Sequence, residues 1–235
     1  MTSKMKKISI ILTFLLTIQQ IVSAQCNVGN YTVTSNQTIT SSCKITGNLT
    51  IANGATLNVN YTGTTADTFI VHGNIVLQGN GVLWVHSSAG STNDQFIVSS
   101  SYKSQWTITT QDSSKLQLEN IDFSAQEGVP AQASYDVNFN AYGKSIIYIN
   151  KCTLDPKTSW ILCNLYDNST LTSYDADRVP TETYPQGSSQ VHLHGTNTRN
   201  GIWMNFESIT DTLNLPPNQS QPLTWGVGKI GRAHV

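Results

Sequence analysis

Charged residues are scarce in this chain of 235 residues. Lys and Arg number 13 and Asp and Glu number 14, together 11% of the sequence, whereas an average soluble domain has about 25%. A helical bundle needs Glu, Lys, Leu and Ala on its helix faces, and a nucleic-acid-binding protein needs a basic patch that neutralises phosphates. The low charge argues against both classes, so no nucleic-acid partner is expected.

Long apolar runs are equally rare, and the one near the N-terminus, over 8–18, is too short to span a bilayer of about 30 Å. It follows three lysines and precedes a small-residue cleavage site that ends at Ala24, which together form a secretory signal peptide. A membrane anchor is the alternative interpretation. We expect residues 1–24 to be a signal peptide and the mature chain to be secreted or held at the cell surface, without a membrane span.

Residues 229–235 show no pattern that links them to the preceding sequence, and 230–235 back-translate into part of a common sequencing adapter. We expect adapter read-through here, so that the natural chain continues beyond about Gly228; a natural basic tail is the alternative. The remaining residues, 25–228, contain eight basic and 14 acidic side chains. Their net charge of −6 makes the exported part mildly acidic.

The four cysteines all lie in the mature part, and an even number suits an oxidising compartment. Three disulfide connectivities are open to four cysteines. The simplest joins sequence neighbours, Cys26 with Cys43 and Cys152 with Cys163, because each pair closes a short loop. Buried free thiols are the alternative, since a solenoid core accepts Cys as a small hydrophobe.

Two segments recur at nearly the same spacing. Residues 47–51 (GNLTI) return 26 positions later at 73–77 (GNIVL), and 65–71 (TADTFIV) return 27 positions later at 92–98 (TNDQFIV). Independent matches with one period indicate a structural repeat.

The repeat unit is a short strand with one apolar face. Apolar and polar residues alternate over four to six positions, and turn-forming pairs such as Asn53-Gly54 separate the units. No helical period follows the signal peptide. The leading apolar residues of these strands are Leu57, Leu83, Leu116, Ile147, Leu171, Val191 and Leu213.

These leading residues are 20–33 positions apart, which fits one coil of a parallel β-helix. A short strand cannot bury its apolar face alone, and stacking of successive coils buries it in a continuous core. A sandwich or barrel requires no coil-length repeat, and a propeller blade repeats at about 40–45 residues. The sequence therefore predicts an all-β solenoid.

Proline usage divides the predicted solenoid. All seven prolines lie at or after position 130, and Pro cannot donate to a β-ladder. We expect residues 25–46 to cap the solenoid and 47–228 to form its coils, with a regular first half. Irregular longer loops are expected in the second half, at 126–134 and 176–187.

Two coils carry a family resemblance. Leu116-x-Leu118-x-Asn120-Ile121-x-Phe123 and its echo Ile147-x-Ile149-x-Lys151-Cys152-x-Leu154 resemble the right-handed parallel β-helix of the pectate-lyase-like superfamily. The resemblance covers roughly 47–215 and implies that architecture. It implies no single activity, because the superfamily includes polysaccharide lyases, hydrolases, adhesins and phage tailspikes.

The catalytic motifs of that superfamily are missing from this sequence. Its calcium-dependent lyases resemble one another in a carboxylate cluster with an Arg, and its pectin hydrolases in Asp pairs beside Gly-His-Gly. The chain has neither Gly-His-Gly nor Asp-Asp, so the resemblance transfers no catalytic residue. No cofactor is expected, except Ca²⁺ if the protein is a lyase.

Asp175, Asp177 and Arg178 place two carboxylates and a guanidinium together before Pro180. Such a pair binds calcium or shares acid and base roles in some enzymes; the alternative, which we favour, is a solvated turn with a local ion pair.

His192 and His194 flank Leu193, which the repeat predicts to face inward, so both imidazoles face outward. They offer two metal ligands or an acid–base group. No third ligand is evident, so we favour exposed strand histidines and expect no metal.

Trp84, Trp106 and Trp203 are aromatic candidates for a ligand contact. If Leu83 and Val85 face inward, Trp84 faces outward, where it would stack on a sugar ring or lie under a loop.

Two functions remain open. The first is a secreted or cell-surface β-helix that acts as a non-catalytic adhesion, polymer-binding or structural module, with a polysaccharide or cell-surface glycan as partner. The alternative is the N-terminal part of a polysaccharide lyase or glycoside hydrolase, motivated by the fold and by Asp175–Arg178.

Overall fold

The computed structural model describes residues 22–23, 26–88, 94–98, 105–125, 136–154, 160–176, 180–194, 203–204, 212–214 and 224–225. For the strand residues after His192 it describes the backbone alone. The expected loop at 126–134, the expected adapter at 229–235, and Asp177 and Arg178 lie outside these residues, as does all of the expected signal peptide except 22–23. No helix in the described ranges is long and apolar enough to cross a membrane.

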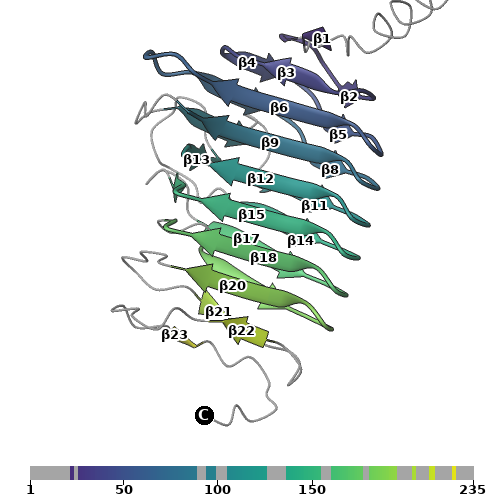
Figure 1. Ribbon diagram of the computed structural model, residues 1–235, viewed down its shortest axis with the longest axis vertical. Coiled ribbons are helices and arrows are strands. Elements are labelled where there is room, and N and C mark those ends of the chain that lie inside the picture. Colours follow the sequence, from purple (N-terminus) through teal and green to yellow (C-terminus); the bar gives the residue numbers. More distant parts are fainter. Residues whose placement is uncertain are drawn as a thin grey trace, which may run out of the picture.

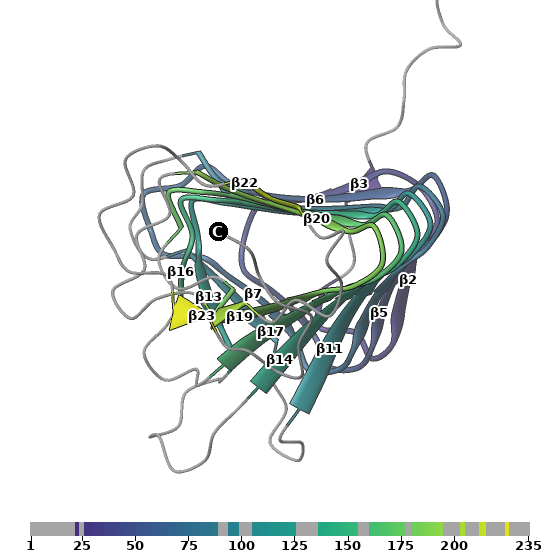
Figure 2. The same ribbon diagram turned by 90° about the horizontal axis from the view of Figure 1, so that it is seen from below.

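The described chain is all-β and forms three sheets, here named A, B and C (Figures 1 and 2). Sheet A contains β1 (Val22–Ser23), β3 (Gln37–Ile39), β6 (Thr56–Tyr61), β9 (Val82–Ser87), β12 (Lys115–Glu119), β15 (Ile146–Asn150), β18 (Thr170–Tyr174), β20 (Gln190–His194) and β22 (Thr212–Asn214). Sheet B contains β4 (Cys43–Ile45), β7 (Thr68–Val71), β10 (Gln95–Val98), β13 (Asp122–Ser124) and β16 (Thr153–Leu154). Sheet C contains β2 (Tyr31–Val33), β5 (Leu49–Ile51), β8 (Ile75–Leu77), β11 (Gln105–Thr110), β14 (Asp136–Ala141), β17 (Trp160–Leu165), β19 (Glu182–Pro185), β21 (Trp203–Met204) and β23 (Thr224–Trp225).

Every pairing between these strands is parallel. From β4 to β18 the chain passes through sheets B, C and A in turn, and the strands of sheet A follow one another along the long axis in Figure 1. This confirms the predicted all-β, parallel organisation, which is compatible with a β-solenoid. The expected cap already takes part in it, because β2, β3 and β4 pair with β5, β6 and β7.

The predicted leading residues form one column in sheet A. Each is the register partner of the next, in the order Leu57, Leu83, Leu116, Ile147, Leu171, Val191 and Leu213. The first six have no exposed surface. A slip of one residue would turn every side chain of a strand to the other face, so this buried column fixes the register of the sheet.

Aromatic side chains fill the core behind sheet B. Phe69, Phe96 and Phe123 are register partners on successive strands, and the repeat of 65–71 at 92–98 predicts the first of these pairings. Their ring centroids lie 5.4 and 5.3 Å apart, first stacked and then edge-on. Each such pair contributes about 0.5–1.5 kcal/mol beyond the burial of its area.

The recurring Gly-Asn pair lies at the turn from sheet B to sheet C and links one coil to the next. The backbone N–H of Asn48 donates to Oδ1 of Asn30, and that of Asn74 donates to Oδ1 of Asn48, both at 2.8 Å. A Cβ on Gly73 would lie 2.4 Å from Oδ1 of Asn48 and 2.6 Å from the backbone of Gly47. Glycine is therefore required wherever the asparagine of the preceding coil packs against the turn.

At the turn from sheet C to sheet A, one position alternates between Asx and Gly on successive coils. In order it is Asn53, Gly79, Asp112, Gly143, Asp167 and Gly187, and all but Asn53 have φ of +57° to +70°.

The carboxylates of this turn bond to the glycines of neighbouring coils. Gly79 and Gly143 donate their N–H groups to Oδ2 of Asp112 and Asp167, at 3.1 and 3.0 Å. A Cβ on Gly79 would lie 2.3 Å from Oδ1 of Asn53. At Gly79 the side chain of the preceding coil thus occupies the space that a Cβ would need, whereas at Gly143 that space is limited by the backbone of Asp112.

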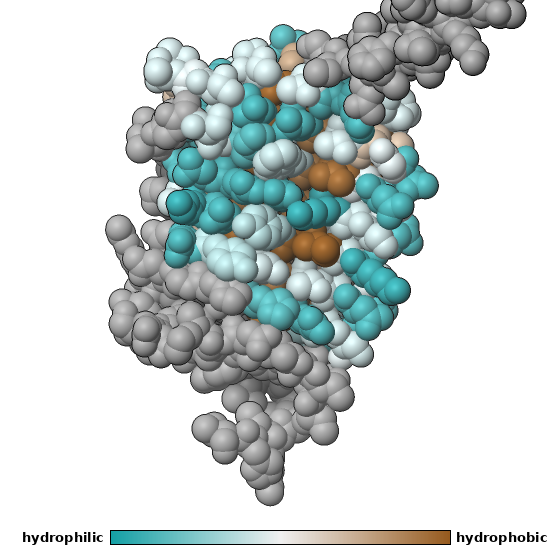
Figure 3. Space-filling view, in the orientation of Figure 1, coloured by the Kyte–Doolittle hydropathy of each residue, from teal (hydrophilic) through white to brown (hydrophobic). Residues whose placement is uncertain are grey.

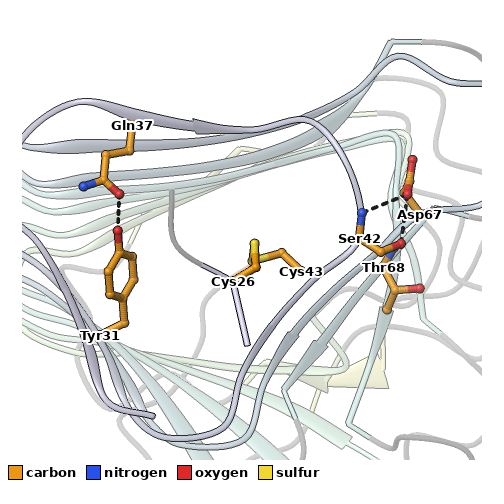
Figure 4. Close-up of a disulfide and its surroundings, with 7 residues drawn as sticks. All are labelled: Cys26, Tyr31, Gln37, Ser42, Cys43, Asp67 and Thr68. Atoms are coloured by element: carbon orange, nitrogen blue, oxygen red, sulfur yellow. Dashed lines mark hydrogen bonds between the residues drawn. A yellow bond between two sulfur atoms is a disulfide. The ribbon is translucent and has the colours of Figure 1, made fainter. Parts of the chain in front are cut away.

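The disulfide joins Cys26 and Cys43, whose Cα atoms lie 5.1 Å apart (Figure 4). It holds the segment before β2 against β4, an outermost strand of sheet B, where Asn27 N–H donates to Lys44 O at 2.7 Å. One predicted pair is confirmed.

The second predicted pair is wrong, because Cys152 and Cys163 are buried free thiols. Cys152 lies between β15 of sheet A and β16 of sheet B, whereas Cys163 lies within β17 of sheet C. The two cysteines are close in sequence but therefore belong to different sides of the core. Burial raises the pKa of the Cys152 thiol to about 12, and burial raises that of Cys163 as well.

The loop expected at 176–187 is also corrected, because β19 lies inside it and pairs with β17. Thr183 and Pro185 face inward, as their burial shows. Gln186 N–H donates to Leu165 O, so the side of Pro185 that lacks an N–H faces away from β17. The described pairing of β19 with β21 joins Glu182 and Thr183 to Trp203 and Met204, so within the described residues this proline interrupts no ladder bond.

We expect Gly73→Ala to lower the free energy of unfolding by about 1–3 kcal/mol, the usual cost of overpacking. Gly63→Ala is the matched control, because a Cβ there meets nothing closer than 3.7 Å. Guanidinium unfolding would measure both, and equal midpoints would show that the Asn48 contact does not constrain the coil.

We expect the double change Cys26→Ser with Cys43→Ser to lower the free energy of unfolding by about 3 kcal/mol, because the disulfide closes a short loop in the unfolded chain. Reductant should lower the melting temperature of the wild type and leave the double variant unchanged. A wild-type melting temperature that is insensitive to reductant would contradict this role.

Candidate functional site

The outward positions of sheet A, from β6 to β20, form a flat surface that we call the outer face (Figures 2 and 3). Its central column, in register, is Asn58, Trp84, Gln117, Tyr148, Thr172 and His192. The column on one side is Thr56, Val82, Lys115, Ile146, Thr170 and Gln190. The column on the other side is Asn60, His86, Glu119, Asn150, Tyr174 and His194.

Trp84 projects from the outer face, as predicted, because Leu83 and Val85 on either side of it are fully buried. Its indole stacks on the imidazole of His86, with centroids 4.0 Å apart and planes 15° from parallel. Nε2 of His86 lies 2.9 Å from Oδ1 of Asn58, a hydrogen bond that holds the stacked pair. Trp106, in contrast, is fully buried in the core and is not available to a ligand; the side chain of Trp203 is not described.

Two tyrosines provide further aromatic surface. The rings of Tyr148 and the exposed Tyr174 lie 5.8 Å apart. Nζ of Lys115 lies 5.5 Å from the centre of the Tyr148 ring, a cation–π arrangement that orders both groups. Burial raises the pKa of Tyr148, and the charge of Glu119 and the neighbouring Tyr174 raise it further. This phenol therefore stays neutral and keeps its O–H donor.

The outer face is close to electrically neutral. Among its described side chains, Lys115 is the one cation and Glu119 the one carboxylate. Glu119 accepts a hydrogen bond from the amide of Gln117 on the same strand. The remaining groups are amides, hydroxyls, rings and two aliphatic side chains, so the face offers stacking and hydrogen bonds rather than charge.

Asp175, a candidate from the sequence, lies directly after β18 and is exposed. Its φ of +47° places it in the left-handed region, as do those of Asn120 and Lys151 after β12 and β15. Asn and Asp tolerate this conformation, so the turn from sheet A accounts for Asp175. Its proposed partners Asp177 and Arg178 lie outside the described residues.

His192 lies half-buried in the central column of the outer face, and its Nε2 lies 3.3 Å from Oε1 of Gln190. Val191 beside it is fully buried, as the repeat predicted. The backbone of His194 is in register with Tyr174, and its side chain is not described. Among the described residues no group of three or more His, Cys, Asp or Glu side chains is placed to hold a metal.

A buried polar cluster lies where sheet A turns towards sheet B. Asp94 is almost fully buried; its Oδ1 accepts the N–H of Asp67 at 2.8 Å. Its Oδ2, the Tyr61 hydroxyl and Ser87 Oγ are buried without a hydrogen-bond partner in the described structure. Burial raises the pKa of Tyr61, and the nearby Asp67 and Asp94 raise it further, so the cluster holds a neutral phenol beside carboxylates.

Sequence reasoning did not identify Tyr148, Tyr174 or Glu119. The signal was present, because the match of 115–123 with 146–154 places Tyr148 beside Gln117. Tyr148 and Tyr174 are far apart in the sequence and become neighbours only through the register of β15 and β18, so they form no cluster in the sequence.

Comparison with protein-family models, with curated proteins and with solved structures gave no match. A function for this chain is therefore inferred from the outer face and its chemistry.

We expect protonation of His86 to destabilise the fold. Burial lowers the pKa of His86, with an opposing effect from Glu119, so the unfolded chain binds the proton more readily. The stability that the neutral imidazole contributes is present above the unfolded-state pKa of about 6.5 and is lost as the pH falls towards the folded pKa.

Thermal unfolding of the wild type and of His86→Gln at pH about 8 and about 5 would measure this effect. The wild type should lose more stability than His86→Gln, since every other ionisable group is common to both. Equal losses would show that His86 is not the group responsible.

Proposed function

We propose that this protein is a secreted or cell-surface right-handed parallel β-helix, similar to the pectate-lyase-like superfamily, that binds a polysaccharide through the outer face without cleaving it. Three all-parallel sheets and the alternation of sheets B, C and A support the β-helix. The disulfide between Cys26 and Cys43 and the predicted signal peptide support an oxidising, extracellular location.

The observation that carries the proposal is the group of rings among amides and hydroxyls on a flat sheet. A sugar has apolar C–H faces and a rim of hydroxyls. Trp84, Tyr148 and Tyr174 provide apolar surface for such faces, and Asn58, Gln117 and their neighbours provide donors and acceptors for the hydroxyls. Hydrogen bonds within the face hold several of these groups in place before a ligand arrives.

The charges of the outer face favour binding to an uncharged polymer. Lys115 and Glu119 offset each other, so the face lacks the excess of cations that would neutralise a polyanion such as polygalacturonate. Glycoside hydrolysis generally uses two carboxyl groups about 5–10 Å apart, whereas Glu119 is the one carboxylate among the described side chains of the face. These features support adhesion to a glycan over an enzymatic role.

We expect the wild type to bind neutral polysaccharides, such as galactomannan, xyloglucan or hydroxyethyl cellulose, more tightly than polygalacturonate or alginate. Trp84→Ala with Tyr148→Ala should weaken binding about tenfold or more, since each lost ring contact is worth about 1 kcal/mol. Affinity electrophoresis followed by titration calorimetry would measure the change.

The matched control is Tyr184→Ala, which removes a half-buried tyrosine from the outward side of sheet C. Its binding should equal that of the wild type. Absence of binding to every polysaccharide, or equal loss in the control, would overturn the proposal. Release of reducing ends or of unsaturated products by the wild type would replace it with the lyase or hydrolase alternative.

A further inference from the structure

The central column of the outer face alternates between rings and hydrogen-bonding side chains. Rings project from β9, β15 and β20, as Trp84, Tyr148 and His192. Gln117 of β12 and Thr172 of β18 stand between them. Aliphatic residues follow the same order in the adjacent column, with Val82 on β9 and Ile146 on β15.

This alternation has a defined spacing. Neighbouring strands of a sheet are about 4.8 Å apart, so rings on every second strand are about 9.5 Å apart. The turn from sheet C to sheet A repeats with the same period. The coils that display rings are those with Gly79, Gly143 and Gly187 at this turn, and the coils between them have Asp112 and Asp167.

We propose that the outer face binds an uncharged, extended polysaccharide with a disaccharide repeat. The polysaccharide chain runs along the solenoid axis and crosses the strands. In such a chain each sugar advances by about one strand spacing, and equatorial linkages turn successive sugars to opposite sides. Alternate sugars then pack on Trp84 and Tyr148, and the sugar between them hydrogen-bonds to Gln117. This inference rests on the proposed function.

The face fits this ligand better than it fits a second copy of the chain. The apolar side chains Val82 and Ile146 are separated by the charged Lys115 on β12, so they form no continuous apolar patch of the kind that protein interfaces bury at their centre. The charge balance of Lys115 and Glu119 selects an uncharged polymer.

A register swap tests the spacing. Trp84→Gln combined with Gln117→Trp keeps the composition of the face but moves the indole from β9 to β12, next to Tyr148. We expect binding of hydroxyethyl cellulose or galactomannan to fall about fivefold, as in Trp84→Gln alone. Unchanged binding by the swap variant, with loss in Trp84→Gln, would overturn the disaccharide spacing and leave the proposed function intact.

Ligand length provides a second measurement that does not depend on a variant. Titration of the wild type with cellobiose through cellohexaose, and with the corresponding mannose oligomers, should show affinity rising mainly at each second added sugar. An equal gain for every sugar would contradict the inference. Failure of every neutral polymer and oligomer to bind, or a change in oligomeric state on Trp84→Ala by light scattering, would overturn both proposals.

Discussion

In-register parallel stacking of successive coils is the constraint on which this molecule depends. Because the side-chain period of a strand is two, the burial of Leu57, Leu83 and Leu116 in one column determines which residues project outward on every coil. The same register therefore determines both the residues of the core and those of the outer face. A slip that exposed the leucines would also remove Trp84 from the face.

The turns keep that register in place. Asn48 and Asn74 tie each coil to the one before it through side-chain acceptors, and Gly73 leaves room for the contact. Coils of 20–33 residues thereby contribute strands to the same sheets, since length differences are taken up between the strands. The disulfide at Cys26 then fixes the segment that lies along an outermost strand of sheet B.

The strands and their register could be predicted from the sequence wherever local segments repeat. The matches at 47–51 and 65–71 gave the strands of sheets C and B in register, and the leading leucines gave sheet A. Cys152 and Cys163 were paired wrongly because nearness in sequence does not reveal which wall of the core a residue faces. The strand β19 could not be predicted, because prolines in the second half indicate loops, although the missing N–H of Pro185 lies on the side away from β17. The candidate site was only partly foreseen, because its tyrosines come from separate coils and meet through register alone.

The alternation of Asx and Gly at the turn from sheet C to sheet A has a consequence for how such a chain can change in length. Since Gly79 donates its N–H to the carboxylate of Asp112, and Gly143 donates its N–H to that of Asp167, two neighbouring coils fit together as a complementary couple. Loss or duplication of a single coil would bring Gly beside Gly or Asp beside Asp, whereas loss or duplication of two leaves the order intact. The couple of coils is therefore the smallest unit whose loss or duplication preserves the hydrogen bonds of this turn.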